Sequence, residues 1–366
     1  MSGIWPPDVG GPASHAPEVA AGLAAHGHTI EVVTTASAPP APQPYRVRYV
    51  SRSLPPGARH VAVSALIAGA ARNADVVYAT SMLGRTTVGT AFARTPLVMK
   101  IAGDPAYERS LRRRWYRGTL ADFQHAKLGP AAAALRRWRT LAAERPAQLV
   151  CPSAFLREIV VSWGIAPDRV TVVPNAAPPL PELPSREDAR ERFGADGATL
   201  AFAGRLTAAK ALDVAFDAVS QADGVTLLVA GDGEERARLA ARAPANVRLL
   251  GSLDRPGVLE LFRAADAALL SSAWENFPHA LVEALAVGTP VLATNVGGIP
   301  EIVGDDENGL LVPAGDADAL AGAIRRFFAD DELRRRLTAA AAPSAERFAS
   351  ERTVEQLEAI LQKAAR

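Results

Sequence analysis

The chain has 366 residues, 49% of them hydrophobic and 22% charged, and its formal net charge is +1. This length predicts two domains, and the near-neutral charge excludes a general attraction to nucleic acid. The one cysteine, Cys151, excludes a disulfide framework and favours a reducing cytoplasm, and the apolar run at 61–71 is far shorter than a membrane span.

Short apolar runs bounded by glycine and proline alternate with helical patterns along the chain. In the first half they predict buried strands at 28–34, 76–80, 97–102 and 148–152. In the second half they predict strands at 200–203, 225–230, 247–250, 267–270, 290–293 and 309–312. This alternation is typical of parallel sheets covered by helices. We therefore expect an α/β fold with two doubly wound, Rossmann-like domains that face each other across a cleft.

The expected domain boundaries follow from a proline-rich stretch between the two halves. Residues 174–184 contain five prolines and predict a semi-rigid linker. The N-terminal domain is then 1–173 and the C-terminal domain 185–345, with a final helical segment within 346–366. The first strand is expected to be short, because only Ser2–Trp5 precedes the first loop. We therefore expect that the chain starts several residues late. Equal melting temperatures for this form and for a form extended upstream would exclude this expectation.

Two cations follow a predicted strand in the second half. The strand leads into Gly204 and Arg205, and Lys210 comes five residues after Arg205, near the start of the next helix. Such a strand-to-helix junction predicts an anion clamp, because an arginine fork, a lysine charge and unpaired helix amides all attract phosphate. A surface arginine and lysine are the alternative. The paired glycines Gly10 and Gly11 also let the backbone approach a phosphate.

Two glutamates surround a predicted helix start at 275–288. Glu275 lies before Pro278, which suits a first helical turn, and Glu283 lies inside the helix, which we expect to end at Gly288. A carboxylate among the apolar residues of this segment needs a polar partner or a ligand hydroxyl, because burying it alone is costly. The alternative is one helix cap and one solvated carboxylate.

Six motifs then occur in an order that identifies a family. They are Gly10–Gly11, Val173–Asn175, Phe202–Leu206 with Lys210, Glu275 with Glu283, Gly297–Glu301 and Asn308–Pro313. Together they resemble the family 4 glycosyltransferases of the GT-B fold over nearly the whole chain. The resemblance implies transfer of a sugar from a UDP- or GDP-linked donor to a hydroxyl, with retention of anomeric configuration and no cofactor or obligatory metal. It also implies a role in polysaccharide, glycolipid or glycoconjugate synthesis, with a glycan, lipid-linked or small-molecule acceptor.

The family pattern assigns roles to the motif residues. Arg205 and Lys210 bind the donor diphosphate, Glu283 the ribose and Glu275 the donor sugar, and the last helix returns to the first domain. The full set of donor-binding candidates is Gly10, Gly11, Gly204, Arg205, Lys210, Glu275, Asn276, Phe277, Pro278 and Glu283. We expect the departing diphosphate to take the acceptor proton, so that Arg205, Lys210 and Glu275 act by electrostatic stabilisation.

The chain departs from the family pattern in its first half. Many relatives carry a histidine after the strand at 97–102, whereas this chain has Asp104 and Glu108. Asp104 is a candidate catalytic or acceptor-binding residue, with a turn carboxylate before Pro105 as the alternative. Glu108 is a second candidate for the acceptor side. His15 is a third, with a surface histidine as the alternative.

A basic and aromatic segment, Arg109–Arg117, is followed by a second one at 136–139. This composition fits an anionic membrane surface, so the cytoplasmic protein could be peripheral at the inner face of the membrane. A solvated helix face is the alternative. Two other functional classes also stay open: a sugar phosphorylase or synthase on the same fold, and a nucleotide-sugar-binding protein without turnover.

Overall fold

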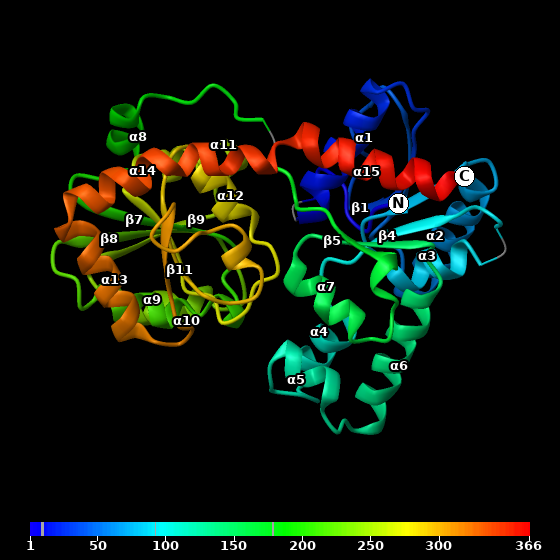
Figure 1. The fold of residues 1–366 in the computed structure, drawn as a ribbon, viewed down its shortest axis with the longest axis horizontal. Coiled ribbons are helices and arrows are strands. Elements are labelled where there is room, and N and C mark those ends of the chain that lie inside the picture. Colours follow the sequence, from blue (N-terminus) through cyan, green and yellow to red (C-terminus); the bar gives the residue numbers. More distant parts are fainter. Residues whose placement is uncertain (9–10, 92, 178) are drawn as a thin grey trace. The chain divides into compact units, whose positions relative to one another are not determined.

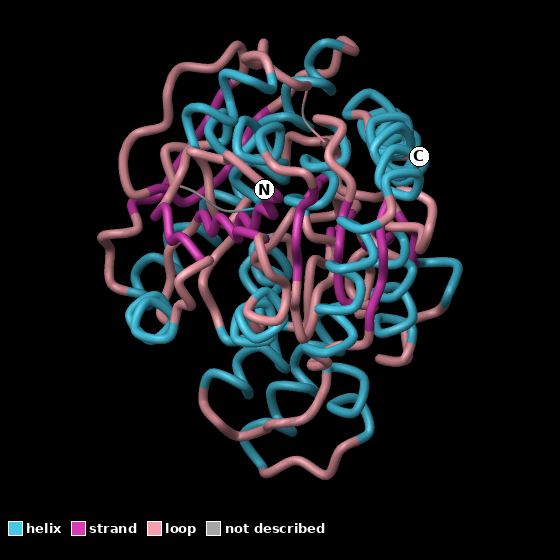
Figure 2. Tube along the Cα trace, turned by 90° about the vertical axis from the view of Figure 1, so that its left-hand side faces the viewer, coloured by secondary structure: helices cyan, strands magenta, loops and turns pink. Residues whose placement is uncertain are grey.

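The structure, a computed structural model, describes residues 1–8, 11–91, 93–177 and 179–366. The chain divides into two compact units, Met1–Ala176 with Ser350–Arg366, and Ala177–Ala349. Parallel strands form the sheets of both units, and helices cover the sheets (Figures 1 and 2). The prediction of an α/β fold with two Rossmann-like domains is therefore confirmed.

The second unit contains one six-stranded parallel sheet in the order β12-β11-β10-β7-β8-β9. Its strands are β7 Ala198–Ala203, β8 Val225–Ala230, β9 Val247–Gly251, β10 Ala267–Leu270, β11 Val291–Thr294 and β12 Gly309–Val312. The chain therefore enters this sheet in the middle, at β7, and adds β8 and β9 on one side. It then returns to the other side of β7, where β10, β11 and β12 follow. The boundary between β7 and β10 is the topological switch point of this unit.

Helices cover both faces of this sheet. They are α8 Arg186–Phe193, α9 Leu212–Val219, α10 Arg236–Arg242, α11 Arg255–Ala264, α12 His279–Ala286, α13 Ala317–Ala329 and α14 Asp331–Ala345. Figure 1 shows α9, α10 and α13 on one side of the sheet and α8, α11, α12 and α14 on the other. The strands are apolar on both faces, as in the fully buried β10 and β11, because each face packs against helices. Short turns complete the unit at η2 Ala208–Lys210, η3 Ile299–Glu301 and η4 Glu346–Phe348.

The first unit contains a pair of parallel strands and a four-stranded parallel sheet. The pair is β1 Glu31–Ala36 with β2 Arg46–Ser51, and the sheet has β3 Val77–Ala79, β4 Leu97–Lys100, β5 Gln148–Cys151 and β6 Val170–Val172 in that order. Residues Met1–Ile4 lie between these two groups. The Ser2 amide donates to Val33 O at 3.1 Å, and Met1 O accepts from the Thr80 amide at 2.9 Å. The segment expected to supply the first strand thus makes backbone hydrogen bonds to both sides, although it is not a regular strand.

The helices of the first unit form the remaining layers. They are α1 Gly11–Ala25, α2 Pro56–Ala71, α3 Leu83–Gly89, α4 Pro105–Arg112, α5 Leu120–His125, α6 Pro130–Glu144, α7 Ala154–Val161 and α15 Ser350–Ala365, with the turn η1 Pro167–Arg169. The helices α1 and α15 pack with β4 and β5 through Leu23, Val98, Val150 and Leu357. A Cβ at Gly22 would lie 2.7 Å from Val354, so this glycine lets α1 and α15 approach closely.

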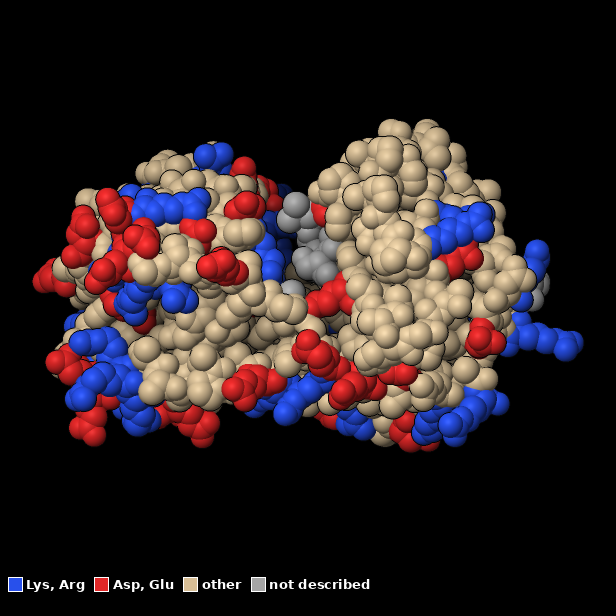
Figure 3. All heavy atoms as spheres, turned by 90° about the horizontal axis from the view of Figure 1, so that it is seen from above, with Lys and Arg blue, Asp and Glu red and all other residues tan. Residues whose placement is uncertain are grey.

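The predicted apolar strands are all present, but two strands were missed. The strand β2 reads Arg-Val-Arg-Tyr-Val-Ser, and its exposed positions carry charged and polar side chains, so it forms no apolar run. The strand β6 has only three residues. Both are outer strands in their groups, where burial on one face is enough. Figure 3 shows acidic and basic side chains mixed over the surface of each unit on the face drawn, in line with the small net charge.

Candidate functional site

The predicted donor-side residues of the second unit gather at the switch point between β7 and β10. The loop after β7 carries Gly204, Arg205 and Lys210, and the loop after β10 carries Glu275 and Asn276. Two loop contacts join them: the Ala273 amide donates to Ala209 O at 2.8 Å, and Ser271 Oγ donates to Lys210 O at 3.0 Å. Ligands of parallel α/β sheets bind beyond the carboxyl ends of the strands at this position.

Arg205 is exposed at the carboxyl end of β7, and it forms no ion pair with any carboxylate of the described residues. The backbone around it is fixed by a neighbouring turn. A Cβ at Gly231 would lie 1.9 Å from Gly204 O, and a Cβ at Gly233 would lie 2.3 Å from Leu206 O. The glycines after β8 are therefore required by close contact with the Arg205 loop.

Lys210 and Glu275 form an ion pair, although the resemblance assigned them to different parts of a donor. Lys210 Nζ contacts Glu275 Oε1, and Ser272 Oγ donates to the same oxygen at 2.9 Å. The side chains of Lys210 and Glu275 are only 20% and 11% exposed. A partly buried carboxylate is thus held by an ammonium and a hydroxyl. Ser272 was missed in the sequence, because a serine after a strand is too common to stand out.

The position of Glu275 also depends on the glycine pair after β11. Gly297 adopts φ +56°, and a Cβ there would lie 1.7 Å from Glu275 O. Only glycine permits both this backbone conformation and this approach. Thr294 Oγ1 donates to Ser272 O at 2.7 Å, which ties the end of β11 to the same loop. The motif at 297–301 therefore acts by fixing the backbone that presents Glu275.

Glu283 lies on α12 and pairs with an arginine that the sequence did not reveal. Arg255 Nε, on the first residue of α11, donates to Glu283 Oε1 at 2.9 Å. Burial raises the pKa of Glu283, and the Arg255 hydrogen bond and charge oppose this rise. The buried helix carboxylate thus has the polar partner that its position requires. Only the packing of α11 against α12 brings Arg255, 28 residues earlier, to this place.

The remaining donor-side candidates have structural contacts. Asn276 and Phe277 are buried, and the Phe277 ring packs edge-on against Phe348 with centroids 5.5 Å apart. Pro278 is the N-cap residue of α12, one position before the first turn where we expected it. The helix ends at Ala286, and Gly288 follows with φ +87°. Gly10 lies outside the described residues, and Gly11 is the first residue of α1.

Asp104 in the first unit is completely buried and caps α4. Its carboxylate accepts hydrogen bonds from the Ala106 and Tyr107 amides at 2.9 and 3.2 Å, and its other oxygen contacts Arg139 Nη1. Gln124 Nε2 donates to that second oxygen at 3.2 Å. Of the two interpretations of Asp104, this geometry favours a structural carboxylate before Pro105. Glu108, one turn further along α4, is exposed.

His15 is buried rather than on the surface, against the buried Lys100. His15 Nε2 and Lys100 Nζ lie 2.9 Å apart, and both residues are only 4% exposed. Burial lowers the pKa of Lys100 to about 7, although nearby Cys151 and Glu18 oppose the shift. Burial in turn raises the pKa of Cys151 to about 12. Lys100 ends β4, so this pair lies at the carboxyl end of that strand. Sequence reasoning missed Lys100 because it reads as an ordinary strand end.

The two basic segments of the first unit differ in their contacts. Arg136 donates to the Phe123, Gln124 and Ala126 carbonyls at 2.9 to 3.2 Å, and Arg139 pairs with Asp104, so both are structural. In the segment Arg109–Arg117, Trp115 is 45% exposed. No helix among residues 1–8, 11–91, 93–177 and 179–366 is both long and apolar enough to cross a bilayer.

These features define a class of protein. Two Rossmann-like units, with cations and carboxylates at the switch point of the second, are the architecture of GT-B glycosyltransferases. Family comparison agrees over both units: residues 9–179 match the model described as Glycosyltransferase Family 4, and residues 185–343 match the one described as Glycosyl transferases group 1. The chain belongs to the family 4 glycosyltransferases.

Several curated relatives are similar over part of their length. A D-inositol 3-phosphate glycosyltransferase from Jonesia denitrificans is 31% identical over 276 residues, covering 67% of this chain and 64% of that protein. A phosphatidyl-myo-inositol mannosyltransferase from Mycobacterium leprae is 37% identical over 161 residues, covering 42% of this chain and 43% of that protein. The chain therefore spans less than two thirds of the length of these relatives.

Solved structures resemble the whole chain in fold. Anabaena Alr3699/HepE in complex with UDP-glucose superposes with a TM-score of 0.77 at 20% identity, covering 99% of this chain and 100% of that one. A sucrose-phosphate synthase from Thermosynechococcus elongatus gives a TM-score of 0.78 at 20% identity, covering 99% and 95%. At this identity the likeness concerns the fold alone.

Proposed function

We propose that the protein transfers a sugar from a UDP- or GDP-linked donor to a hydroxyl acceptor, in the synthesis of a polysaccharide, glycolipid or glycoconjugate. The observation that carries the proposal is the grouping of Arg205, Lys210 and Glu275 at the β7/β10 switch point. Arginine and lysine beside each other are suited to a diphosphate, and a fixed carboxylate is suited to sugar hydroxyls. The names of the relatives, which include a mannosyltransferase, and a fold neighbour solved with UDP-glucose support the same chemistry.

In the proposed mechanism the protein acts by electrostatic stabilisation. Arg205 and Lys210 bind the oxygens of the leaving diphosphate and stabilise the charge that grows there as the glycosidic bond breaks. Glu275 binds hydroxyls of the donor sugar, and Glu283 the ribose. The acceptor hydroxyl attacks from the face that the diphosphate leaves, and the diphosphate takes its proton, so the anomeric configuration is retained. This proposal needs no protein nucleophile, cofactor or obligatory metal.

Nucleotide binding is the first test of the proposal. We would measure the thermal stabilisation by UDP, GDP, ADP and dTDP of the protein and of the Arg205→Ala/Lys210→Ala variant, each with and without EDTA. We expect one uridine or guanosine nucleotide to raise the melting temperature, and the double variant to lose this shift. A shift that survives in the double variant would refute the clamp, and a shift that disappears with EDTA would refute metal independence.

Turnover separates the proposal from the two alternatives. With the matching nucleotide sugar and an acceptor mixture, we expect release of the nucleoside diphosphate and a product whose anomeric configuration, read by NMR, equals that of the donor. Consumption of sugar 1-phosphate without nucleotide would indicate a phosphorylase. Donor binding without release would indicate a binding protein, and inverted configuration would refute retention.

We also propose that the protein works in the cytoplasm and binds the inner membrane surface through Arg109–Arg117. Trp115 and Leu111 are 45% and 38% exposed within this basic segment, which gives it an apolar and a cationic component. We expect flotation with vesicles that contain anionic lipid, weakened by salt. Equal binding to neutral vesicles would contradict this proposal.

A further inference from the structure

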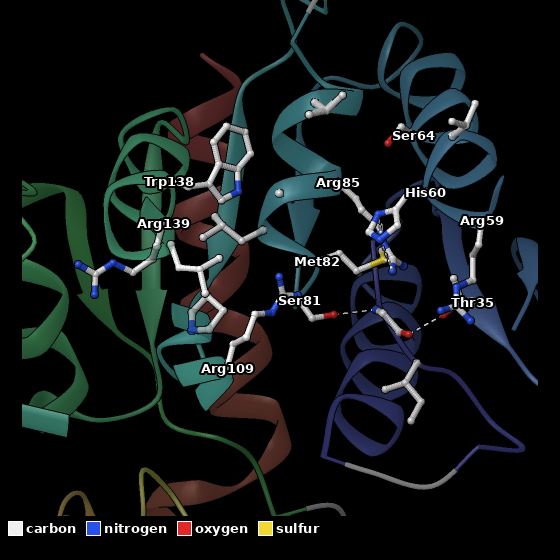
Figure 4. A pocket seen from close by; sticks show the side chains of 18 of the residues that line it. Thr35, Arg59, His60, Ser64, Ser81, Met82, Arg85, Arg109, Trp138 and Arg139 are labelled. Atoms are coloured by element: carbon white, nitrogen blue, oxygen red, sulfur yellow. Dashed lines mark hydrogen bonds between the residues drawn. The ribbon is translucent and has the colours of Figure 1, made fainter. Parts of the chain in front are cut away.

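A large pocket lies in the first unit, and none of the residues that line it belongs to the proposed donor site. Its volume is about 1150 Å³, and residues from α2, α3, α4 and α6 line it together with Gly3 and Ile4 (Figure 4). Thr35 near the end of β1, Ser81 just after β3 and Pro105 after β4 also line it. The pocket therefore opens at the carboxyl ends of parallel strands, where Rossmann-like sheets bind ligands.

The charge of this pocket is of one sign. The described residues that line it include five arginines and one histidine, which are Arg52, Arg59, His60, Arg85, Arg109 and Arg139. None of the described lining residues is an aspartate, a glutamate or a lysine. Two of the arginines have carboxylate partners nearby, since Arg52 pairs with Asp8 at 3.1 Å and Arg139 pairs with Asp104. For Arg59, Arg85 and Arg109, no carboxylate of the described residues lies within ion-pair distance. These three come from three different helices, α2, α3 and α4.

Two of these three arginines, Arg59 and Arg85, are held in place by neutral hydrogen-bond partners. Arg85 Nε donates to His60 Nδ1 at 2.8 Å, and Figure 4 shows this pair side by side next to Met82. Arg59 Nη1 donates to Arg52 O at 2.8 Å, and the Arg59 Nε atom is buried without a hydrogen-bond partner in the described part of the chain. Burial lowers the pKa of Arg85, and the charges of Arg59 and Arg52 lower it further. Burial lowers the pKa of His60, and the charges of Arg85, Arg59 and Arg109 do so as well.

This arrangement differs from ordinary surface arginines. Like charges that converge without a counter-charge repel one another, so their grouping costs free energy unless an anion compensates. The guanidinium fork matches the geometry of phosphate oxygens, and the exposed ring of Trp138 beside them offers an apolar surface for the rest of a ligand. The chemistry fits a phosphate ester with an organic group attached.

We infer that this pocket binds the phosphate group of a phosphorylated acceptor, through Arg59, Arg85 and Arg109. That the ligand is an acceptor rests on the proposed function, whereas the phosphate site itself does not. The phosphate could belong to a soluble sugar phosphate or to the headgroup of a lipid, and both present the same oxygens to the arginines.

The test is phosphate binding in a chain whose donor clamp has been removed. In the Arg205→Ala/Lys210→Ala background, we would titrate glycerol 3-phosphate and inorganic pyrophosphate by calorimetry, with glycerol as the uncharged control. The membrane arm compares vesicles of phosphatidylglycerol with vesicles of phosphatidylcholine. We expect the protein to bind at least one of the anionic probes, either the soluble phosphates or the phosphatidylglycerol vesicles. The affinity for that probe should fall at least tenfold when Arg59→Gln and Arg85→Gln are added. Binding only to the anionic vesicles would assign the phosphate to a lipid headgroup.

Two further variants keep the test independent of folding. Arg109→Gln changes an exposed side chain and leaves the Arg59 and Arg85 contacts intact, so it should weaken binding without lowering the melting temperature. Arg72→Gln, exposed just after the end of α2 and outside the pocket, should change nothing. The inference is overturned if neither anionic arm binds, or if Arg72→Gln weakens binding as much as the pocket variants do. Failure of donor turnover would leave the binding result unchanged, so the two proposals can fail separately.

Discussion

The ammonium group of Lys210 contacts the carboxylate of Glu275, a residue 65 positions further along the chain. The contact joins the loop after β7 to the loop after β10 at the switch point of the sheet. Because Glu275 compensates one of two neighbouring cations, it sets the net charge that Arg205 and Lys210 present to a diphosphate. A substitution at Glu275 should therefore affect sugar and phosphate binding in different directions.

Glu275→Gln should separate these two effects. We expect turnover of the nucleotide sugar to fall by about tenfold to a hundredfold, because a charged hydrogen bond contributes about 1.5 to 3 kcal/mol. The affinity for the free nucleoside diphosphate should hold or rise, since Lys210 loses its counter-charge. Steady-state kinetics and calorimetry with the free nucleotide measure the two quantities. Equal losses in both would mean that Glu275 has a structural role only.

Arg205→Ala should reduce turnover much more than it reduces stability. The side chain is exposed and makes no ion pair in the described part of the chain, so its removal leaves no buried charge behind. Loss of one preorganised donor costs about 2.7 to 4 kcal/mol of transition-state stabilisation, which is two to three orders of magnitude in kcat. Arg335→Ala, an exposed arginine on α14, is the matched control. A kcat within threefold of wild type would remove Arg205 from the mechanism.

Gly297→Ala tests whether the glycine pair positions Glu275. The backbone at Gly297 has φ +56°, and the new methyl group would collide with Glu275 O. Gly288→Ala is the control, because Gly288 also has a positive φ, at +87°, but has open space around it. Both variants should lose about 1 to 2 kcal/mol of stability from the backbone conformation. Only Gly297→Ala should also lose donor turnover, and equal kinetics in the two variants would contradict this role.

Asp104→Ala should behave as a stability variant. It removes a helix cap and leaves Arg139 buried without its carboxylate, which costs about 3 to 5 kcal/mol. Adding Arg139→Ala should recover part of this loss, because the uncompensated charge is then gone. Urea denaturation of the two single variants and the double variant measures the coupling. If Asp104→Ala keeps its stability but loses kcat, Asp104 acts in catalysis instead.

The sequence predicted most of this fold because buried parallel strands are apolar on both faces. It could not reveal β2, an outer strand in which Arg46 and Arg48 interrupt the apolar pattern. In the candidate site, Arg205, Lys210 and Glu275 were identifiable because each follows a strand, and the carboxyl ends of parallel strands meet at one edge.

Residues whose partners come from other elements were beyond sequence reasoning. Arg255 meets Glu283 only because α11 packs on α12, and Asp104 meets Arg139 across 35 residues. Arg59, Arg85 and Arg109 of the pocket belong to three different helices, and no local sequence pattern shows that they come together. Sequence patterns thus located the site residues that directly follow strands. The partners of the other residues depend on tertiary packing, which no local pattern shows.

The buried Lys100 should make stability depend on pH. Burial lowers its pKa from 10.5 to about 7 in the folded protein. Between these two values the unfolded chain binds a proton that the folded protein does not, so the free energy of unfolding rises with pH across this window. The slope from this group is at most about 1.4 kcal/mol per pH unit. The titratable groups facing Lys100 are His15 and Glu18 on α1 and Cys151 on β5.

Lys100→Met removes this group and should remove its share of the slope. We expect the stability advantage of Lys100→Met over wild type to shrink steadily from pH 7.5 to 9.5, as urea denaturation at each pH would measure. Lys363→Met, an exposed lysine on α15, should differ from wild type by the same amount at every pH. A difference for Lys100→Met that stays constant across the window would mean that Lys100 keeps its ordinary proton affinity. The apolar surroundings at the end of β4 would then admit enough water to solvate its charge.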